Sequence, residues 1–156
     1  DNEEIIKEAR RVVEEYKKAV DRLEELVRRA ENAKHASEKE LKDIVREILR
    51  ISKELNKVSE RLIELWERSQ ERARGSEGSG SEGSTAEELL EVHKKSDRVT
   101  KEHLRVSEEI LKVVEVLTRG EVSSEVLKRV LRKLEELTDK LRRVTEEQRR
   151  VVEKLN

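Results

Sequence analysis

Apolar residues recur along most of the chain at alternating steps of three and four residues, which is the spacing of one face of an α-helix. The first such row consists of Ile5, Ala9, Val12, Tyr16, Ala19, Leu23, Leu26, Ala30 and Ala33. Comparable rows follow in three further stretches. A second apolar row, repeating every seven residues, widens each stripe beyond what a two-stranded coiled coil needs. The pattern predicts four long helices around a shared core, with left-handed coiled-coil packing and crossing angles near ~20°.

Helix-capping signals set the expected boundaries at about 2–33, 38–74, 86–118 and 124–155. Ser37 with Glu40, and Thr85 with Glu88, have the spacing of capping boxes. Gly120 suits the left-handed residue after a helix end, and Ser123 suits the cap of the last helix. Residues 75–84 read Gly-Ser-Glu-Gly-Ser-Gly-Ser-Glu-Gly-Ser, a composition typical of a flexible linker.

The short turns near 34–37 and 119–123 require each helix pair to fold back as a hairpin. Residues 1–74 then form hairpin one and residues 85–156 form hairpin two. A ten-residue linker reaches at most ~35 Å, whereas the second helix should be ~55 Å long. The end of the second helix must therefore lie beside the start of the third. The sequence predicts an all-α, antiparallel, up-down-up-down four-helix bundle.

Polar residues interrupt the apolar rows at positions that should face the core. Burying a hydroxyl, amide or imidazole without a partner costs roughly 1–3 kcal/mol, so these groups should satisfy one another. An alternative is that Ser and Thr are merely tolerated as small residues, while His and Gln reach water. The candidates for a buried polar network are Tyr16, Ser52, Asn56, Ser59, Ser69, His93, Ser96, Thr100, His103, Ser107, Thr138, Thr145 and Gln148.

Hairpin geometry predicts which of these residues lie at the same height. Around the turn near residue 121, His103 should lie level with Thr138, Ser96 with Thr145, and His93 with Gln148. Around the first turn, Tyr16 should lie level with Leu55 and Asn56, and packing of the hairpins should bring His93 near Trp66 and His103 near residues 56–59. Two networks are expected. One contains Tyr16, Asn56, Ser59, Thr100, His103 and Thr138; the other contains His93, Ser96, Thr145, Gln148 and, as a further candidate, Ser69.

The charge pattern argues against nucleic acid as a partner. Residues 1–74 carry 19 basic and 19 acidic side chains, and residues 85–156 carry 17 and 16. A phosphate backbone needs an excess of Lys and Arg on one face, which neither half has. No apolar run approaches the ~20 residues of a membrane span, and no signal peptide is evident, so we expect a soluble protein without a membrane partner.

Catalytic and metal-binding patterns are also missing from the sequence. The chain has no Cys, and His93 and His103 are too far apart along one helix to share a metal ion. Neither histidine has the Glu at i−3 that a di-iron bundle requires. No nucleophile elbow or phosphate-binding glycine loop is present, and a packed seam offers no substrate cleft. We expect no enzyme activity, no cofactor, no metal and no small-molecule substrate.

The linker, the heptad stripes, the polar seam and the surfaces rich in Glu, Lys and Arg together resemble de novo designed helical-bundle heterodimers with buried hydrogen-bond networks. The resemblance implies two hairpins fused into one chain by a Gly/Ser/Glu linker. It also implies a pairing module whose polar seam supplies specificity, with hairpin 1–74 binding hairpin 85–156 within one chain or by swapping between chains. The alternative is a natural helical adaptor or coiled-coil binding protein.

Overall fold

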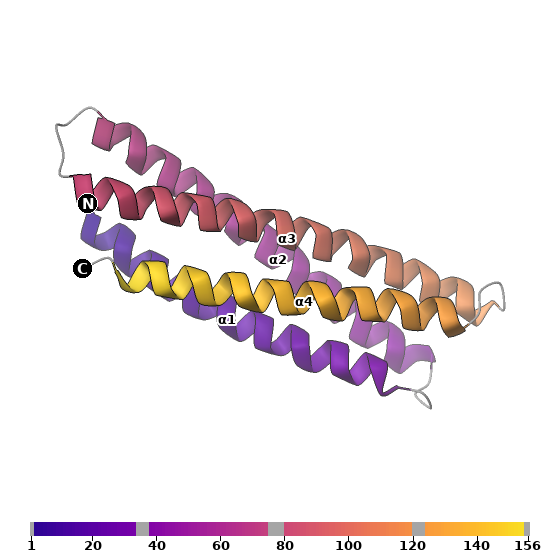
Figure 1. Cartoon of the computed structure of the whole chain (residues 1–156). Coiled ribbons are helices and arrows are strands. Elements are labelled where there is room, and N and C mark those ends of the chain that lie inside the picture. Colours follow the sequence, from indigo (N-terminus) through magenta and orange to yellow (C-terminus); the bar gives the residue numbers. More distant parts are fainter. Residues whose placement is uncertain (1, 34–37, 75–79, 120–123, 155–156) are drawn as a thin grey trace.

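The computed structural model describes residues 2–33, 38–74, 80–119 and 124–154, and these ranges contain four helices. They are α1 (Asn2–Glu31), α2 (Glu38–Arg74), α3 (Gly80–Thr118) and α4 (Ser124–Glu153). Successive helices run in opposite directions along a common long axis, so the start of α1 and the end of α4 lie at the same end (Figure 1). The predicted all-α four-helix bundle is confirmed.

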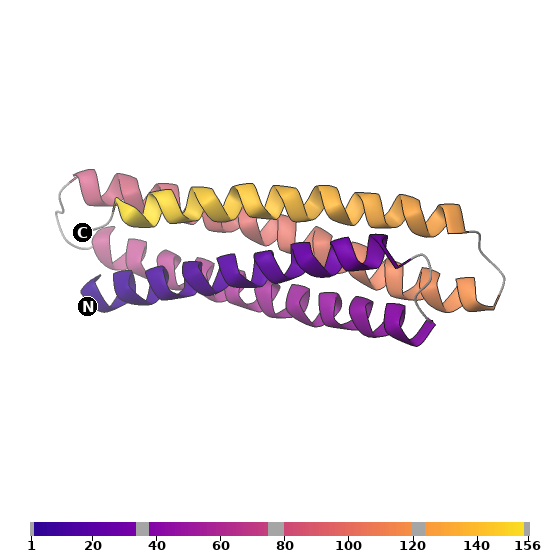
Figure 2. The ribbon, with the colours of Figure 1, turned by 90° about the horizontal axis from the view of Figure 1, so that it is seen from below.

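The helices form a closed ring in chain order. Helix α1 packs against α2, α2 against α3, α3 against α4, and α4 against α1, while the diagonal pairs keep their backbones apart (Figure 2). The pairs α2–α3 and α1–α4 join one hairpin to the other. Side chains that reach the centre can therefore contact three helices at once.

A layer of polar residues divides the apolar core into two parts. The longer part lies toward the end of the bundle where α1 ends and α2 begins, and it includes Leu23, Leu26, Ile48, Ile110 and Leu134. The shorter part lies toward the other end. It contains Ala9, Val12, Val13, Leu62, Trp66, Leu89, Leu90, Val151 and Val152.

The second apolar row is buried unequally among the helices. In α1 and α4 it is buried from Val13 to Val27 and from Val130 to Val151, whereas Ile44, Val58 and Val99 of α2 and α3 are only half-buried. No large apolar side chain is exposed among the residues whose burial is described. The wide stripe therefore faces a multi-helix core.

Helix α3 begins at Gly80 rather than near residue 86, so the prediction of a linker through residue 84 is wrong at its second half. Once a helix has formed, adding a residue requires only the propensity of that residue, and Ser and Glu are acceptable. The glycines at 80 and 83 weaken this extension by about 1 kcal/mol each without ending it. The predicted capping residues Ser37, Gly120 and Ser123 lie outside the described residues.

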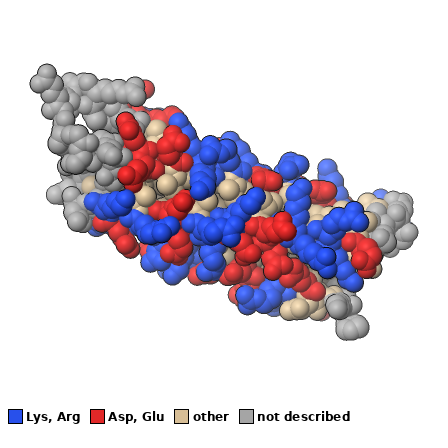
Figure 3. All heavy atoms as spheres, in the orientation of Figure 1, with Lys and Arg blue, Asp and Glu red and all other residues tan. Residues whose placement is uncertain are grey.

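Charged side chains of both signs cover the visible face of the bundle and alternate along it (Figure 3). Within the described ranges, no helix combines the length and apolar character needed to cross a membrane.

Replacing Leu134 with Ala should lower the free energy of unfolding by about 3 kcal/mol, because Leu134 is fully buried and its removal leaves a cavity. The neighbouring substitution Lys133→Ala, at an exposed position, should change it by less than about 0.5 kcal/mol. Denaturant unfolding followed by circular dichroism measures both values. Equal losses for the two variants would contradict the assigned core.

Candidate functional site

The structure places the predicted seam residues inside the bundle. Asn56 is half-buried, and the side chain of Ser69 is outside the described part of the chain. The remaining predicted residues are all buried, and they are Tyr16, Ser52, Ser59, His93, Ser96, Thr100, His103, Ser107, Thr138, Thr145 and Gln148. Most of them belong to three hydrogen-bonded groups, which we call the His103, Tyr16 and His93 clusters.

The His103 cluster joins α2, α3 and α4. The Nδ1 atom of His103 lies 2.7 Å from Ser52 Oγ on α2, and Nε2 lies 3.0 Å from Thr138 Oγ1 on α4. Ser107 Oγ lies 3.4 Å from the same Nδ1 and 3.5 Å from Ser52 Oγ. His103 and Ser107 are completely buried, so the interaction is shielded from solvent.

Backbone carbonyls fix the direction of these hydrogen bonds. Thr138 Oγ1 donates its only proton to Leu134 O at 2.8 Å, so it can only accept from His103 Nε2–H. Nδ1 of the neutral ring is then an acceptor, and Ser52 donates to it. Ser107 donates to the backbone oxygen of His103 at 2.8 Å. The donor of each hydrogen bond is therefore determined, and His103 must be the neutral tautomer with its proton on Nε2.

The Tyr16 cluster crosses the centre of the bundle. Tyr16 of α1 donates its hydroxyl proton to Leu55 O of α2 at 2.9 Å and accepts from Ser96 Oγ of α3 at 3.3 Å. Burial raises the pKa of Tyr16 to about 12, so the phenol keeps the proton that this arrangement requires. The Tyr16 hydroxyl therefore links the diagonal helices α1 and α3 directly and also bonds to α2.

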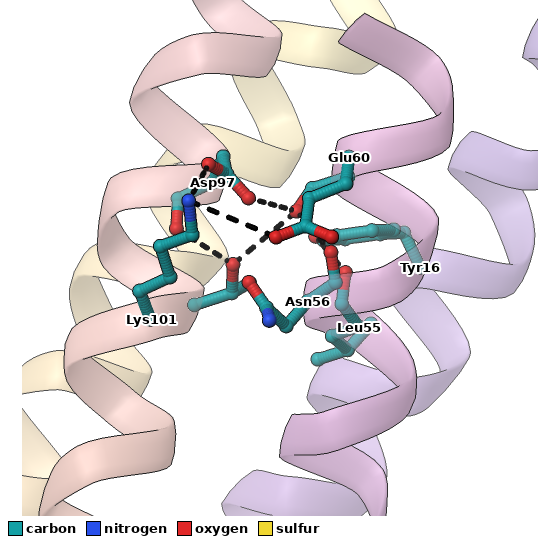
Figure 4. Close-up of polar contacts among 8 residues, drawn as sticks. Tyr16, Leu55, Asn56, Glu60, Asp97 and Lys101 are labelled. Atoms are coloured by element: carbon teal, nitrogen blue, oxygen red, sulfur yellow. Dashed lines mark hydrogen bonds and ion pairs between the residues drawn. The ribbon is translucent and has the colours of Figure 1, made fainter. Parts of the chain in front are cut away.

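Ser59 and Thr100 are hydrogen-bonding neighbours of the Tyr16 phenol, and they connect it to a buried carboxylate that was not predicted from the sequence. Asp97 accepts a hydrogen bond from Ser59 Oγ at 2.9 Å and pairs with Lys101 Nζ at 2.9 Å, and Lys101 also lies 3.7 Å from Glu60 (Figure 4). Thr100 lies 3.4 Å from Ser59 and donates to Asp97 O. The available signal was the position of Asp97 between two seam residues, four residues before a lysine.

The His93 cluster lies toward the end of the bundle where α3 begins. Gln148 Nε2 donates to His93 Nδ1 at 3.3 Å. The ring of His93 stacks on Trp66 of α2, with centroids 6.3 Å apart and planes inclined by 20°. This position beside Trp66 and Gln148 agrees with the hairpin geometry inferred from the sequence.

Several predicted pairings differ in the structure. Ser96 bonds to Tyr16 rather than joining His93, because the long phenol reaches across the bundle to it. His103 bonds to Ser52, about one turn from the expected residues 56–59, so His103 and Thr138 form a cluster apart from Tyr16.

Two predicted members form no hydrogen bond between side chains. Thr145 donates to Leu141 O of its own helix at 2.7 Å. The backbone oxygen of Asn56 lies 2.9 Å from Ser59 Oγ and shares the single Ser59 proton with Asp97, while the side-chain oxygen of Asn56 has no protein partner. A polar residue on a helix can therefore satisfy itself locally, which spacing alone does not reveal.

The Ser52–His103 contact has the atoms of a nucleophile and a base, but its surroundings do not favour catalysis. The third partner is the Thr138 hydroxyl rather than a carboxylate, and the histidine is fully enclosed. Within the described ranges, no group of three His, Asp or Glu side chains is placed to hold a metal ion.

Ion pairs accompany the buried clusters along the α1–α4 contact. Arg142 pairs with Asp21 at 2.8 Å and also with Glu24, and Arg149 pairs with Glu14 at 3.0 Å. All three acids are on α1 and both arginines are on α4. Each pair is partly exposed and stabilises weakly, but the signs favour one pairing of helices.

One acidic contact opposes this trend. Burial and the nearby Glu135 carboxylate raise the pKa of Glu31 to about 7. The α1–α4 contact therefore contains a pair of like charges as well as complementary ones.

No known protein-family model matches the chain, and no curated protein matches it in sequence.

Replacing Thr138 with Val should lower the free energy of unfolding by about 1–3 kcal/mol, because it leaves His103 Nε2–H buried without an acceptor. Thr145→Val is the matched control on the same helix, because Thr145 bonds only to its own backbone. That control should cost less than about 1 kcal/mol. Equal effects in denaturant unfolding would show that the Thr138–His103 bond contributes nothing.

Acid should weaken the fold between about pH 6.5 and 4. Burial lowers the pKa of both His93 and His103 to about 4, from an ordinary value near 6.5. The stability contributed by the neutral rings is complete above pH 6.5 and is lost as pH falls toward 4, amounting to about 2 kcal/mol per histidine at pH 5.

Denaturant midpoints at pH 7.5 and pH 5 measure this loss. The double variant His93→Asn, His103→Asn provides the subtraction, because it keeps every carboxylate that also titrates. The same shift in both proteins would exclude the buried histidines as its cause.

Proposed function

We propose that the chain is a designed structural and interaction module in which hairpin one binds hairpin two specifically, with no catalytic activity. The observation that carries this proposal is the hydrogen-bonded path from Ser52 through His103 to Thr138. It begins on hairpin one and ends on hairpin two, in the centre of their contact. Specific recognition needs polar groups at the centre of the contact between the hairpins, whereas folding alone needs them less.

Every cluster crosses the boundary between the hairpins. Ser52 meets His103, Tyr16 meets Ser96, Ser59 meets Asp97, and Trp66 stacks on His93. In each pair the first residue belongs to hairpin one and the second to hairpin two. Polar groups that serve only a hairpin's own stability would not need partners on the other hairpin, as Ser52, Ser59 and Ser96 have.

Incorrect pairings of the hairpins carry an energetic cost. A slipped register or a wrong partner leaves buried donors and acceptors alone, and each costs roughly 1–3 kcal/mol. A few such losses are comparable with the total stability of a typical domain, about 5–15 kcal/mol. The apolar rows would accept many partners, whereas Tyr16, His103 and Asp97 accept few.

Surface charge favours the same partner. A pair of two hairpin-two units would lack Glu14, Asp21 and Glu24 as partners for Arg142 and Arg149. The loss of these ion pairs disfavours such a pair, most strongly at low ionic strength. The acidic residues of α1 are therefore complementary in charge to the two arginines of α4.

Composition supports a designed origin. The chain lacks Pro, Cys, Met and Phe, uses a Gly/Ser/Glu segment between its halves, and fills its surface with Glu, Lys and Arg. These choices follow the habits of idealised helical bundles, in which regular heptads are combined with deliberately placed polar positions.

Cleavage between the hairpins tests the proposal. A protease site placed within residues 75–79 allows the folded chain to be cut, unfolded in denaturant and refolded, with native mass spectrometry of the products. A complex of one hairpin one with one hairpin two is expected. Homodimers of each hairpin in statistical amounts would contradict specific pairing.

The polar cluster can be separated from the apolar core in the same experiment. A cleavable variant carrying Ser52→Ala, His103→Leu, Ser107→Ala and Thr138→Val should remain helical but form homodimers together with the 1:1 complex. A cleavable Thr145→Val variant is the control and should keep the 1:1 complex. Unchanged selectivity in the fourfold variant would assign specificity elsewhere.

A further inference from the structure

A buried carboxylate lies at the contact between the two hairpins. Among the residues whose burial is described, Asp97 is the only buried one with an acidic, lysine or arginine side chain. It lies on α3 of hairpin two and is 8% exposed. Removing a carboxylate from water costs far more than removing a hydroxyl, so Asp97 depends on the groups that replace the water. The origin of those groups therefore decides which partner hairpin two can accept.

The two oxygens of this carboxylate have partners of different origin. Oδ2 pairs with Lys101 Nζ at 2.9 Å, and Lys101 lies about one turn further along the same helix. Oδ1 accepts from Ser59 Oγ of hairpin one at 2.9 Å. Lys101 accompanies Asp97 in every complex of hairpin two, so it balances the charge without distinguishing partners. Ser59 is supplied by the partner, and this contact changes when the partner changes.

The Ser59 hydroxyl is a suitable donor although its proton is shared. Ser59 Oγ also lies 2.9 Å from Asn56 O of its own helix. Hydrogen bonds to an ionised acceptor are roughly twice as strong as those between neutral groups, so the Asp97 carboxylate is the stronger of the two acceptors. Ser59 is 0% exposed, and solvent does not compete for its proton. A partner without a donor at position 59 would leave Oδ1 of Asp97 unsatisfied.

An acid at position 59 would be worse than a missing donor. Lys101 Nζ lies between Asp97 and Glu60 of hairpin one, 3.7 Å from the Glu60 carboxylate (Figure 4). One ammonium group would then face three acids, two of them buried. Two carboxylates within hydrogen-bonding distance cannot both remain ionised without a large cost. Hairpin two therefore excludes a partner that has an acid at position 59.

We propose that Ser59 and Asp97 form a directional specificity site, through which hairpin two accepts a partner with a hydroxyl donor at position 59 and rejects one with a carboxylate. This inference rests on the proposed function, because it concerns which hairpins pair. The site differs from the His103 and His93 clusters, whose groups are neutral, because its acid and its donor can be exchanged between the hairpins. The exchange, Ser59→Asp with Asp97→Ser, should reverse the direction of recognition.

Unfolding of four full-length chains tests the site without cleavage. The chains are the unmodified protein, Ser59→Asp, Asp97→Ser and the exchanged double variant. Ser59→Asp places two acids opposite each other and should lower the denaturant midpoint the most, and the double variant should recover most of that loss. A double variant that is no more stable than Ser59→Asp would overturn the proposal.

A second double variant controls for a general effect of negative charge. Glu60→Ser combined with Ser59→Asp also removes one acid of the site, but the Glu60 side chain is 53% exposed and contacts only Lys101 there. It should recover little of the lost midpoint. A recovery equal to that given by Asp97→Ser would overturn the proposal.

Pairing itself is measured by mixing two cleavable chains, the unmodified one and the exchanged double variant labelled with nitrogen-15. Both carry a protease site within residues 75–79. After cleavage they are unfolded together, refolded and weighed by native mass spectrometry. Matched 1:1 complexes should exceed mixed ones at least about tenfold, because one mixed complex brings two carboxylates together. Equal amounts of matched and mixed complexes would overturn the proposal.

The same spectra test the proposed function independently. Homodimers from the cleaved, unmodified chain alone would contradict specific pairing of the hairpins. Complexes that are all 1:1, with random exchange between the two chains, would contradict only the Ser59–Asp97 site. If the exchanged hairpins do not refold after cleavage, the midpoints of the uncleaved chains still decide the outcome.

Discussion

The structure depends on one constraint: a polar atom that is removed from water must find a partner of the right kind inside the bundle. Apolar contacts tolerate rotation and sliding, because any aliphatic surface can replace another. A hydrogen bond does not, since it requires a donor opposite an acceptor at a short distance. The carbonyl of Leu134 accepts a hydrogen bond from the Thr138 hydroxyl, and this bond determines the donor and acceptor in each hydrogen bond around His103.

Under the proposed function, this constraint is what gives a plain bundle a preferred partner. The leucine and valine layers on either side of the polar seam supply most of the association energy. The hydroxyls, the phenol and the imidazoles contribute little net energy when correctly paired, but they penalise every incorrect pairing. Asp97 acts in the same way nearer the surface, where Lys101 balances its charge and Ser59 fixes the position of its carboxylate.

Much of this architecture was predictable because helix periodicity is a strong signal. The spacing of Leu23, Leu26 and Ala30 determines which face of α1 is buried, whatever the neighbouring helices are. The same reasoning placed Tyr16, His93 and His103 inside, and hairpin geometry placed His103 beside Thr138. These inferences needed only the rise of a helix and the position of a turn.

The remaining details depend on side-chain length and on local competition. The Tyr16 side chain is long enough to reach the diagonal helix α3, so Ser96 bonds to Tyr16 and not to the His93 cluster in which helix spacing placed it. Thr145 bonds to its own backbone, and Asp97 was missed because it lies beside the seam rather than on it. The start of α3 at Gly80 reflects helix propagation, which weak helix formers reduce but do not stop.

The position of a single proton, that on the ring of His103, is the most specific consequence of these hydrogen bonds. Nitrogen chemical shifts of the His103 imidazole at neutral pH, measured on the full chain, report which nitrogen carries it. The account predicts one slowly exchanging proton on Nε2 and an unprotonated, hydrogen-bonded Nδ1. A proton on Nδ1, or averaged shifts from a ring that exchanges both forms with solvent, would contradict it.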